Sequence, residues 1–116
     1  MKDNKEQILF VDQMNKRAVT SVKQFVKSTI RREAMHYVTL SEAYATYIQF
    51  NKWREYSPDY EDRMLYLTKS EFLAYFRYVM ADTFGTTDII KDNSIAWDNT
   101  TFVPKTEIPG YPFSKN

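Results

Sequence analysis

The chain has 116 residues, with 16 Lys or Arg, 15 Asp or Glu, no Cys and a formal net charge of +1. This length predicts one domain. The lack of Cys excludes disulfides, thiol catalysis and Cys-ligated zinc, and it fits an intracellular, cytoplasmic protein. No apolar run approaches the roughly 18 residues of a membrane span, so we expect no membrane partner.

The first third of the chain favours helix. No Gly or Pro occurs between Lys2 and Ser57, and residues 1–14 form an N-terminal extension in which a further helix is left open. A helix is predicted from about Asn15 to Glu33, because apolar side chains recur there at helical spacing. These side chains are Val19, Val22, Val26 and Ile30.

Two helix-start signals follow. Thr39–Glu42 and Thr68–Glu71 both have the sequence Thr-x-Ser-Glu, in which the Thr hydroxyl and the Glu carboxylate satisfy each other's backbone N–H groups. They predict a second helix from Ser41 to about Arg54 and a third from Lys69 to about Thr83. Met35–Val38 has extended character, which predicts a short strand before the second helix.

The third helix is predicted to end at Gly85, and a β-hairpin pattern follows. Asp88–Ile90 and Ile95–Trp97 have strand character, and Lys91–Ser94 has the composition of a turn. Thr100–Val103 either extends the second of these strands or adds a third.

This order of elements predicts an α+β fold of the winged-helix type. The expected architecture is three main helices and a C-terminal β-hairpin wing over residues 15–103. Residues 104–116, with three of the four prolines, form a flexible tail.

Catalytic chemistry finds little support in the sequence. Gly85 and Gly110 are the only glycines and His36 is the only histidine, so no phosphate-binding glycine loop or His-based metal site is present. The acidic residues between Pro58 and Arg63 lack the spacing of a calcium loop and are interpreted as a solvated loop. We therefore expect no enzyme activity, no cofactor and no metal.

Binding chemistry is better supported, because winged helices place their last helix in the DNA major groove and the wing on the backbone. The candidate nucleic-acid contacts are Lys69, Ser70, Arg77, Tyr78, Lys91 and Asn93. Asp82 and Asp92 lie close to these residues in the sequence, and their negative charge weakens the expected contact with DNA.

The alternative is a protein–protein adaptor built on the same fold. Winged helices also serve as scaffolds, and the near-neutral charge favours this use. Tyr111 and Phe113 of the C-terminal tail are the candidate partner contacts, since aromatic side chains supply much of the binding energy at protein interfaces. Residues 1–36 nevertheless hold eight Lys or Arg against four Asp or Glu, which suits either a contact patch or a solvated helix face.

About three-quarters of the chain resembles the C-terminal winged-helix region of primase-helicases from large DNA viruses, phages and plasmids. The resemblance runs from Ser21 to Lys105, and the segments that carry it are Val22–Val26, Val38–Tyr44, Tyr47, Trp53, Leu67–Phe72 and Ser94–Trp97. In that family the module follows a helicase ATPase and is thought to contact DNA, whereas these 116 residues contain no ATPase motif. The resemblance implies a role in DNA replication, within a cell or a virus-infected host cell, and gives the possible DNA contact to Lys69, Ser70, Arg77 and the hairpin.

The leading expectation is therefore a non-catalytic module that binds DNA with weak to moderate affinity, in replication or transcription. Binding to other protein subunits is the second expectation.

Overall fold

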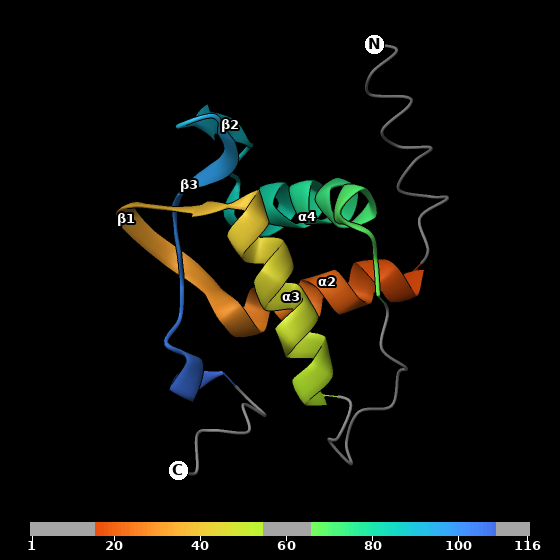
Figure 1. Cartoon of the computed structure of the whole chain (residues 1–116). Coiled ribbons are helices and arrows are strands. Elements are labelled where there is room, and N and C mark those ends of the chain that lie inside the picture. Colours follow the sequence, from red (N-terminus) through yellow and green to blue (C-terminus); the bar gives the residue numbers. More distant parts are fainter. Residues whose placement is uncertain (1–15, 55–65, 109–116) are drawn as a thin grey trace.

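A computed structural model describes residues 16–54 and 66–108 of the chain. In these ranges the α+β class is confirmed, with three α-helices and one three-stranded antiparallel sheet (Figure 1). The elements in chain order are α2 (Lys16–Thr29), β1 (Ile30–Thr39), α3 (Leu40–Arg54), α4 (Lys69–Phe84), β2 (Ile89–Lys91), β3 (Ser94–Phe102) and a 3-10 turn η1 (Lys105–Glu107).

The first described helix is shorter than predicted. α2 ends at Thr29, where the Thr29 hydroxyl donates to the Phe25 carbonyl (2.6 Å) and the Thr29 carbonyl accepts from the Val103 N–H (2.8 Å). The chain then pairs with β3 from Ile30 onward. The prediction of helix to Glu33 was wrong because tertiary hydrogen bonds to the C-terminal strand override the helical spacing of Ile30.

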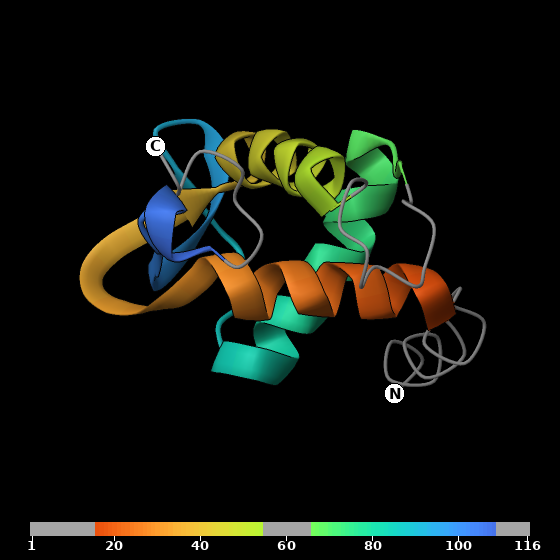
Figure 2. The same cartoon turned by 90° about the horizontal axis from the view of Figure 1, so that it is seen from below.

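Strand β1 makes the predicted hairpin part of a larger sheet. The strand order is β1-β3-β2, so the sheet is not a simple C-terminal wing, since its first strand lies between α2 and α3. The register slips between Arg32 and Tyr37, so that four residues of β1 lie opposite Asn99 alone. Met35 lies at the centre of this bulge, with φ 67° and a 95% exposed side chain. Figure 2 shows β1 curving out from the end of α2.

The β2–β3 hairpin is confirmed. Lys91 pairs with Ser94, and the two residues between them, Asp92 and Asn93, have φ values of 48° and 64°. Positive φ at both central positions is the geometry of a type I′ turn, whose twist matches that of the strands. Thr100–Phe102 extends β3 rather than forming a separate strand.

Both predicted capping boxes are present. The Thr39 and Thr68 hydroxyls each accept from the backbone N–H of the Glu three residues on (3.2 Å in both), and each Glu carboxylate accepts from the N–H of its Thr. α4 ends at Gly85, whose φ of 68° is left-handed and whose N–H donates to the Ala81 carbonyl (2.9 Å). These signals are local, which is why the sequence located the start of both helices.

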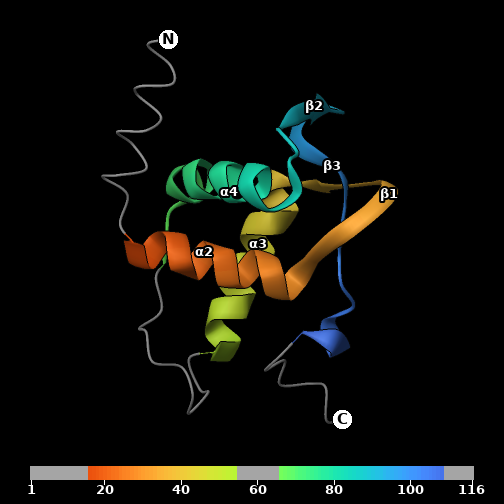
Figure 3. The ribbon, with the colours of Figure 1, turned by 180° about the vertical axis from the view of Figure 1, so that it is seen from behind.

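The core is aromatic and joins all three helices to the sheet. The Phe25 ring of α2 lies edge-on to the rings of Tyr47 and Phe72, at centroid distances of 5.4 and 6.0 Å. Phe76 of α4 meets Trp97 of β3 at 4.7 Å in a T-shaped pair. α3 crosses in front of α2 in Figure 1 and behind it in Figure 3. The core thus fixes which side of each helix faces outward.

The first residues of the predicted C-terminal tail contact the rest of the domain. Residues 105–107 form η1, and Ile108 is buried in the core. Residues 109–116 and the N-terminal extension lie outside the described residues. In the parts of the chain that the structure describes, no helix has the length and apolar character needed to cross a membrane.

Replacing Gly85 tests the cap of α4. A Cβ at this position meets nothing within 4 Å, so the cost of Gly85→Ala comes from the left-handed backbone alone, and we expect a loss of about 1–2 kcal/mol of unfolding free energy. Gly85→Asn is the matched control, because Asn tolerates this conformation. Urea denaturation of the three proteins measures the difference, and an equal loss in both variants would contradict the backbone explanation.

The buried Tyr47 hydroxyl makes the stability of the fold sensitive to alkaline pH. Its hydroxyl is hydrogen-bonded to that of Ser21 (2.9 Å), and burial raises the pKa of Tyr47 above its ordinary value of 10.0, partly offset by hydrogen bonds from Ser21 and Asn51. An acid with a raised folded-state pKa contributes stability that is present below its unfolded pKa and is lost as pH rises through the folded pKa. The stability advantage of the wild type over Tyr47→Phe should therefore shrink as the pH rises above 10.0, the ordinary Tyr value, in urea denaturation. A constant difference as the pH rises would contradict the assignment.

Candidate functional site

The predicted contact residues lie on the outer face of α4 and on the β2–β3 hairpin. The inner face of α4 is buried through Phe72, Phe76, Val79 and Met80. On the outer face Ser70, Arg77 and Ala81 are exposed, and Tyr78 is half-buried against the core. This face is therefore open to a partner.

Lys69 and Ser70 are the first two residues of α4, and both are exposed. The Lys69 ammonium donates to the Ser41 hydroxyl in α3 (3.1 Å). The Lys69 side chain therefore reaches from the start of α4 to the start of α3. The first turn of a helix leaves N–H groups free and carries a partial positive charge, which favours an anion. Glu71, in the same turn, already occupies part of this position through the capping box.

Arg77 is paired with an acid. Its Nε and Nη2 donate to the two carboxylate oxygens of Asp88, at 2.9 and 3.1 Å. The side chains are 49% and 27% exposed. Exposed pairs of this kind contribute only about 0–1 kcal/mol to stability, so the pair opens at little cost, but the carboxylate charge stays beside Arg77.

Lys91 is also paired. Its ammonium lies 3.2 Å from the Asp98 carboxylate and 4.9 Å from the centroid of the Tyr37 ring. Asn93, at the tip of the hairpin, is exposed. The structure thus leaves the hairpin tip accessible while compensating its one lysine.

The net charge of this surface is negative. Residues 69–102 hold three basic and five acidic side chains, and the latter are Glu71, Asp82, Asp88, Asp92 and Asp98. Residues 16–32, by contrast, hold no acidic side chain and six basic ones. The basic residues are Lys16, Arg17, Lys23, Lys27, Arg31 and Arg32. Of the five acids, Asp82 and Asp92 were expected from the sequence to weaken this surface. The pairing of Asp88 with Arg77 and of Asp98 with Lys91 was not predicted.

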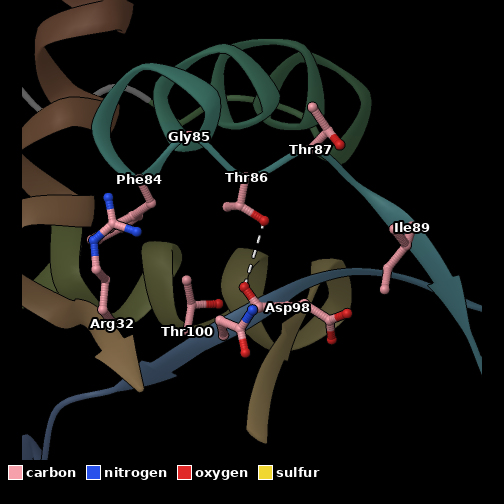
Figure 4. A pocket seen from close by; sticks show the side chains of 9 residues that line it. Arg32, Phe84, Gly85, Thr86, Thr87, Ile89, Asp98 and Thr100 are labelled. Carbon is pink, nitrogen blue, oxygen red and sulfur yellow. Dashed lines mark hydrogen bonds between the residues drawn. The ribbon is translucent and has the colours of Figure 1, made fainter. Parts of the chain in front are cut away.

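A shallow cleft of about 390 Å³ lies between the end of α4 and strand β3 (Figure 4). Its walls include Arg32, whose guanidinium lies 5.4 Å from the Phe84 ring centroid, and Thr86, whose hydroxyl donates to the Asp98 carbonyl (3.5 Å). This cleft was not predicted from the sequence, because its walls come from three separate segments of the chain, namely Arg32, residues 84–89 and residues 98–100. No pattern in the sequence signals it beyond Gly85, which directs the chain out of α4.

The other candidates are placed as follows. His36 is exposed, and its Nδ1 lies 3.0 Å from the Ala34 carbonyl. Among residues 16–54 and 66–108, no three His, Asp or Glu side chains come together as a metal site. Tyr111, Phe113 and the acidic residues between Pro58 and Arg63 lie outside the described residues.

Comparison of the chain with protein-family models, with curated proteins and with solved structures finds no match.

The Arg77–Asp88 pair generates a prediction for nucleic-acid binding. Asp88→Asn frees Arg77 and removes one negative charge, so affinity for a DNA duplex should rise about threefold to tenfold at low salt, the effect of roughly one phosphate contact. Asp82→Asn is the matched control, because it removes the same charge from α4 without releasing Arg77. Fluorescence anisotropy on a labelled duplex measures both. Equal gains would show that the field of the surface matters and that Arg77 makes no contact.

Proposed function

We propose that this chain is a winged-helix module that binds nucleic acid without catalysing a reaction. The order helix-strand-helix-helix-strand-strand, with the third helix beside the last two strands, supports this fold type. The observation that carries the proposal is the open outer face of α4 beside the exposed tip of the β2–β3 hairpin. A helix with a flanking β-ribbon is a shape that enters the major groove and contacts the adjoining backbone.

The roles follow from position. The exposed start of α4, with Lys69 and Ser70, suits a phosphate. Arg77 suits a base edge or a phosphate once Asp88 releases it. Asn93 and Lys91 suit the backbone beside the groove, and Tyr78 supplies a half-buried ring at the edge of the surface. The resemblance to the primase-helicase module makes DNA replication the proposed setting, with transcription as the other.

A protein adaptor is the second candidate, and a different surface favours it. Met35, Tyr37 and Ile90 are exposed apolar or aromatic side chains of the sheet. Exposed side chains of this kind are common at protein interfaces. Such a partner would bind with little dependence on salt, because these side chains are uncharged and the neighbouring Lys91 is paired with Asp98.

One titration separates the two functions. We expect a labelled duplex or single strand to bind with micromolar affinity at about 50 mM salt, and the logarithm of the association constant to fall linearly with the logarithm of salt concentration. Fluorescence anisotropy with both probes gives the affinity and the slope. No binding at tens of micromolar protein, roughly the non-specific range, would overturn the nucleic-acid proposal and leave the adaptor.

A further inference from the structure

We propose that the exposed face of α2, together with the start of β1, binds the phosphate backbone of the nucleic acid. We call this face the α2 stripe and define it as Lys16, Thr20, Lys23, Gln24, Lys27 and Arg31. The inference rests on the proposed nucleic-acid binding and adds the surface that supplies most of its charge.

The first step is geometry. Positions 16, 20, 23, 24 and 27 are linked by steps of three or four residues (16 to 20, 20 to 23 or 24, and on to 27), so they lie on one side of a helix. The opposite side of α2 is buried through Ala18, Val22, Phe25, Val26 and Thr29. Because Phe25 is held between rings of α3 and α4, the core fixes the rotation of α2. The stripe residues are accordingly exposed, except Lys23, which is half-buried. Figure 3 shows α2 in front of α3 on this side of the molecule.

The second step is charge. α2 contains four basic residues and no acid, and the next acid is Glu33. Among the ion pairs of the described residues, none involves Lys16, Lys23 or Lys27. Arg31 has only a loose contact with Glu33, at 3.7 Å. The lysines of the stripe are thus available, whereas Arg77 of α4 and Lys91 of β2 are compensated by Asp88 and Asp98.

The third step is the kind of partner. Thr and Gln side chains between lysines are the groups that, with Lys and Arg, make most contacts to DNA phosphates. Lys16 and Lys27 are separated by about 16 Å along the helix, roughly the axial length of five base pairs. The stripe therefore has the length and chemistry to follow a phosphate backbone.

Two other partners fit less well. A helix that binds an anionic membrane inserts its apolar face, but that face of α2 forms the core. A protein partner binds tightly through buried aromatic or apolar anchors, and the stripe has none. Nucleic acid is a polyanion that binds without an inserted apolar face and without a buried aromatic anchor.

The test removes two stripe cations and compares them with two others. Lys23→Gln/Lys27→Gln should weaken binding of a labelled duplex by about tenfold or more at 50 mM salt and reduce the slope of log affinity against log salt by about 1.8, at roughly 0.9 per phosphate contact. The control, Lys52→Gln/Lys105→Gln, removes the same charge from exposed positions on α3 and η1 and should change affinity less than about threefold with an unaltered slope. Circular dichroism and urea denaturation establish that both variants fold.

The outcomes distinguish the two proposals. If the wild type binds nucleic acid and both double variants weaken this binding equally, the role of the stripe is overturned. The proposed nucleic-acid function then stays intact. Absence of wild-type binding overturns both. Vesicles of anionic phospholipid serve as a further probe, and binding to them that depends on Lys23 and Lys27, without binding to nucleic acid, would assign the stripe to a membrane surface instead.

Discussion

The packing of Phe25 is the constraint on which the rest of the structure depends. Its ring lies within 5.4–6.3 Å of the ring centroids of Tyr47, Phe50, Phe72 and Phe76, so one side chain of α2 contacts both other helices. Phe76 in turn meets Trp97 of β3. Aromatic pairs in such edge-to-face arrangements add about 0.5–1.5 kcal/mol each beyond the burial of area. Three helices and the sheet are thereby held in one orientation, and each helix has a single side left for a partner.

That orientation separates charge across the molecule. The charged residues on the side of α2 that cannot enter the core are all cations, whereas the outer side of α4 and the hairpin carry more acids than bases. Had α2 been rotated by half a turn, its lysines would have met the aromatic core, where an unpaired charge is costly. The core therefore determines which helix presents the positive surface, and that helix is α2 rather than the one that the fold type would suggest.

Local signals account for the parts of the fold that the sequence predicted. The two Thr-x-Ser-Glu caps, the glycine after α4 and the Asp92–Asn93 turn act over a few residues, and each is present as expected. The start of β1 was missed because Ile30 continues the apolar spacing of α2, and only pairing with Phe102 makes it a strand. Met35 adopts a positive φ without being Gly or Asn, so its bulge has no signal in the composition.

Of the candidate site, the sequence predicted the exposed residues of α4 and the hairpin tip. The partners of Arg77 and Lys91, which are supplied by tertiary structure, could not be predicted from sequence alone.

The ion pairs of Arg77 and Lys91 and the lysines of the α2 stripe act over different distances. Seen from farther than a Debye length, about 8 Å at physiological salt, Arg77 with Asp88 is a dipole with no net charge. Lys16, Lys23 and Lys27 of the α2 stripe take part in no ion pair among the described residues, so their field extends farther toward a polyanion. An approaching nucleic acid would therefore be oriented by α2, and Arg77 would contribute only after contact, when a phosphate or base edge competes with Asp88 at hydrogen-bonding distance. Under the proposed function, α2 would account for the rate and salt dependence of association, and α4 would account for any sequence preference.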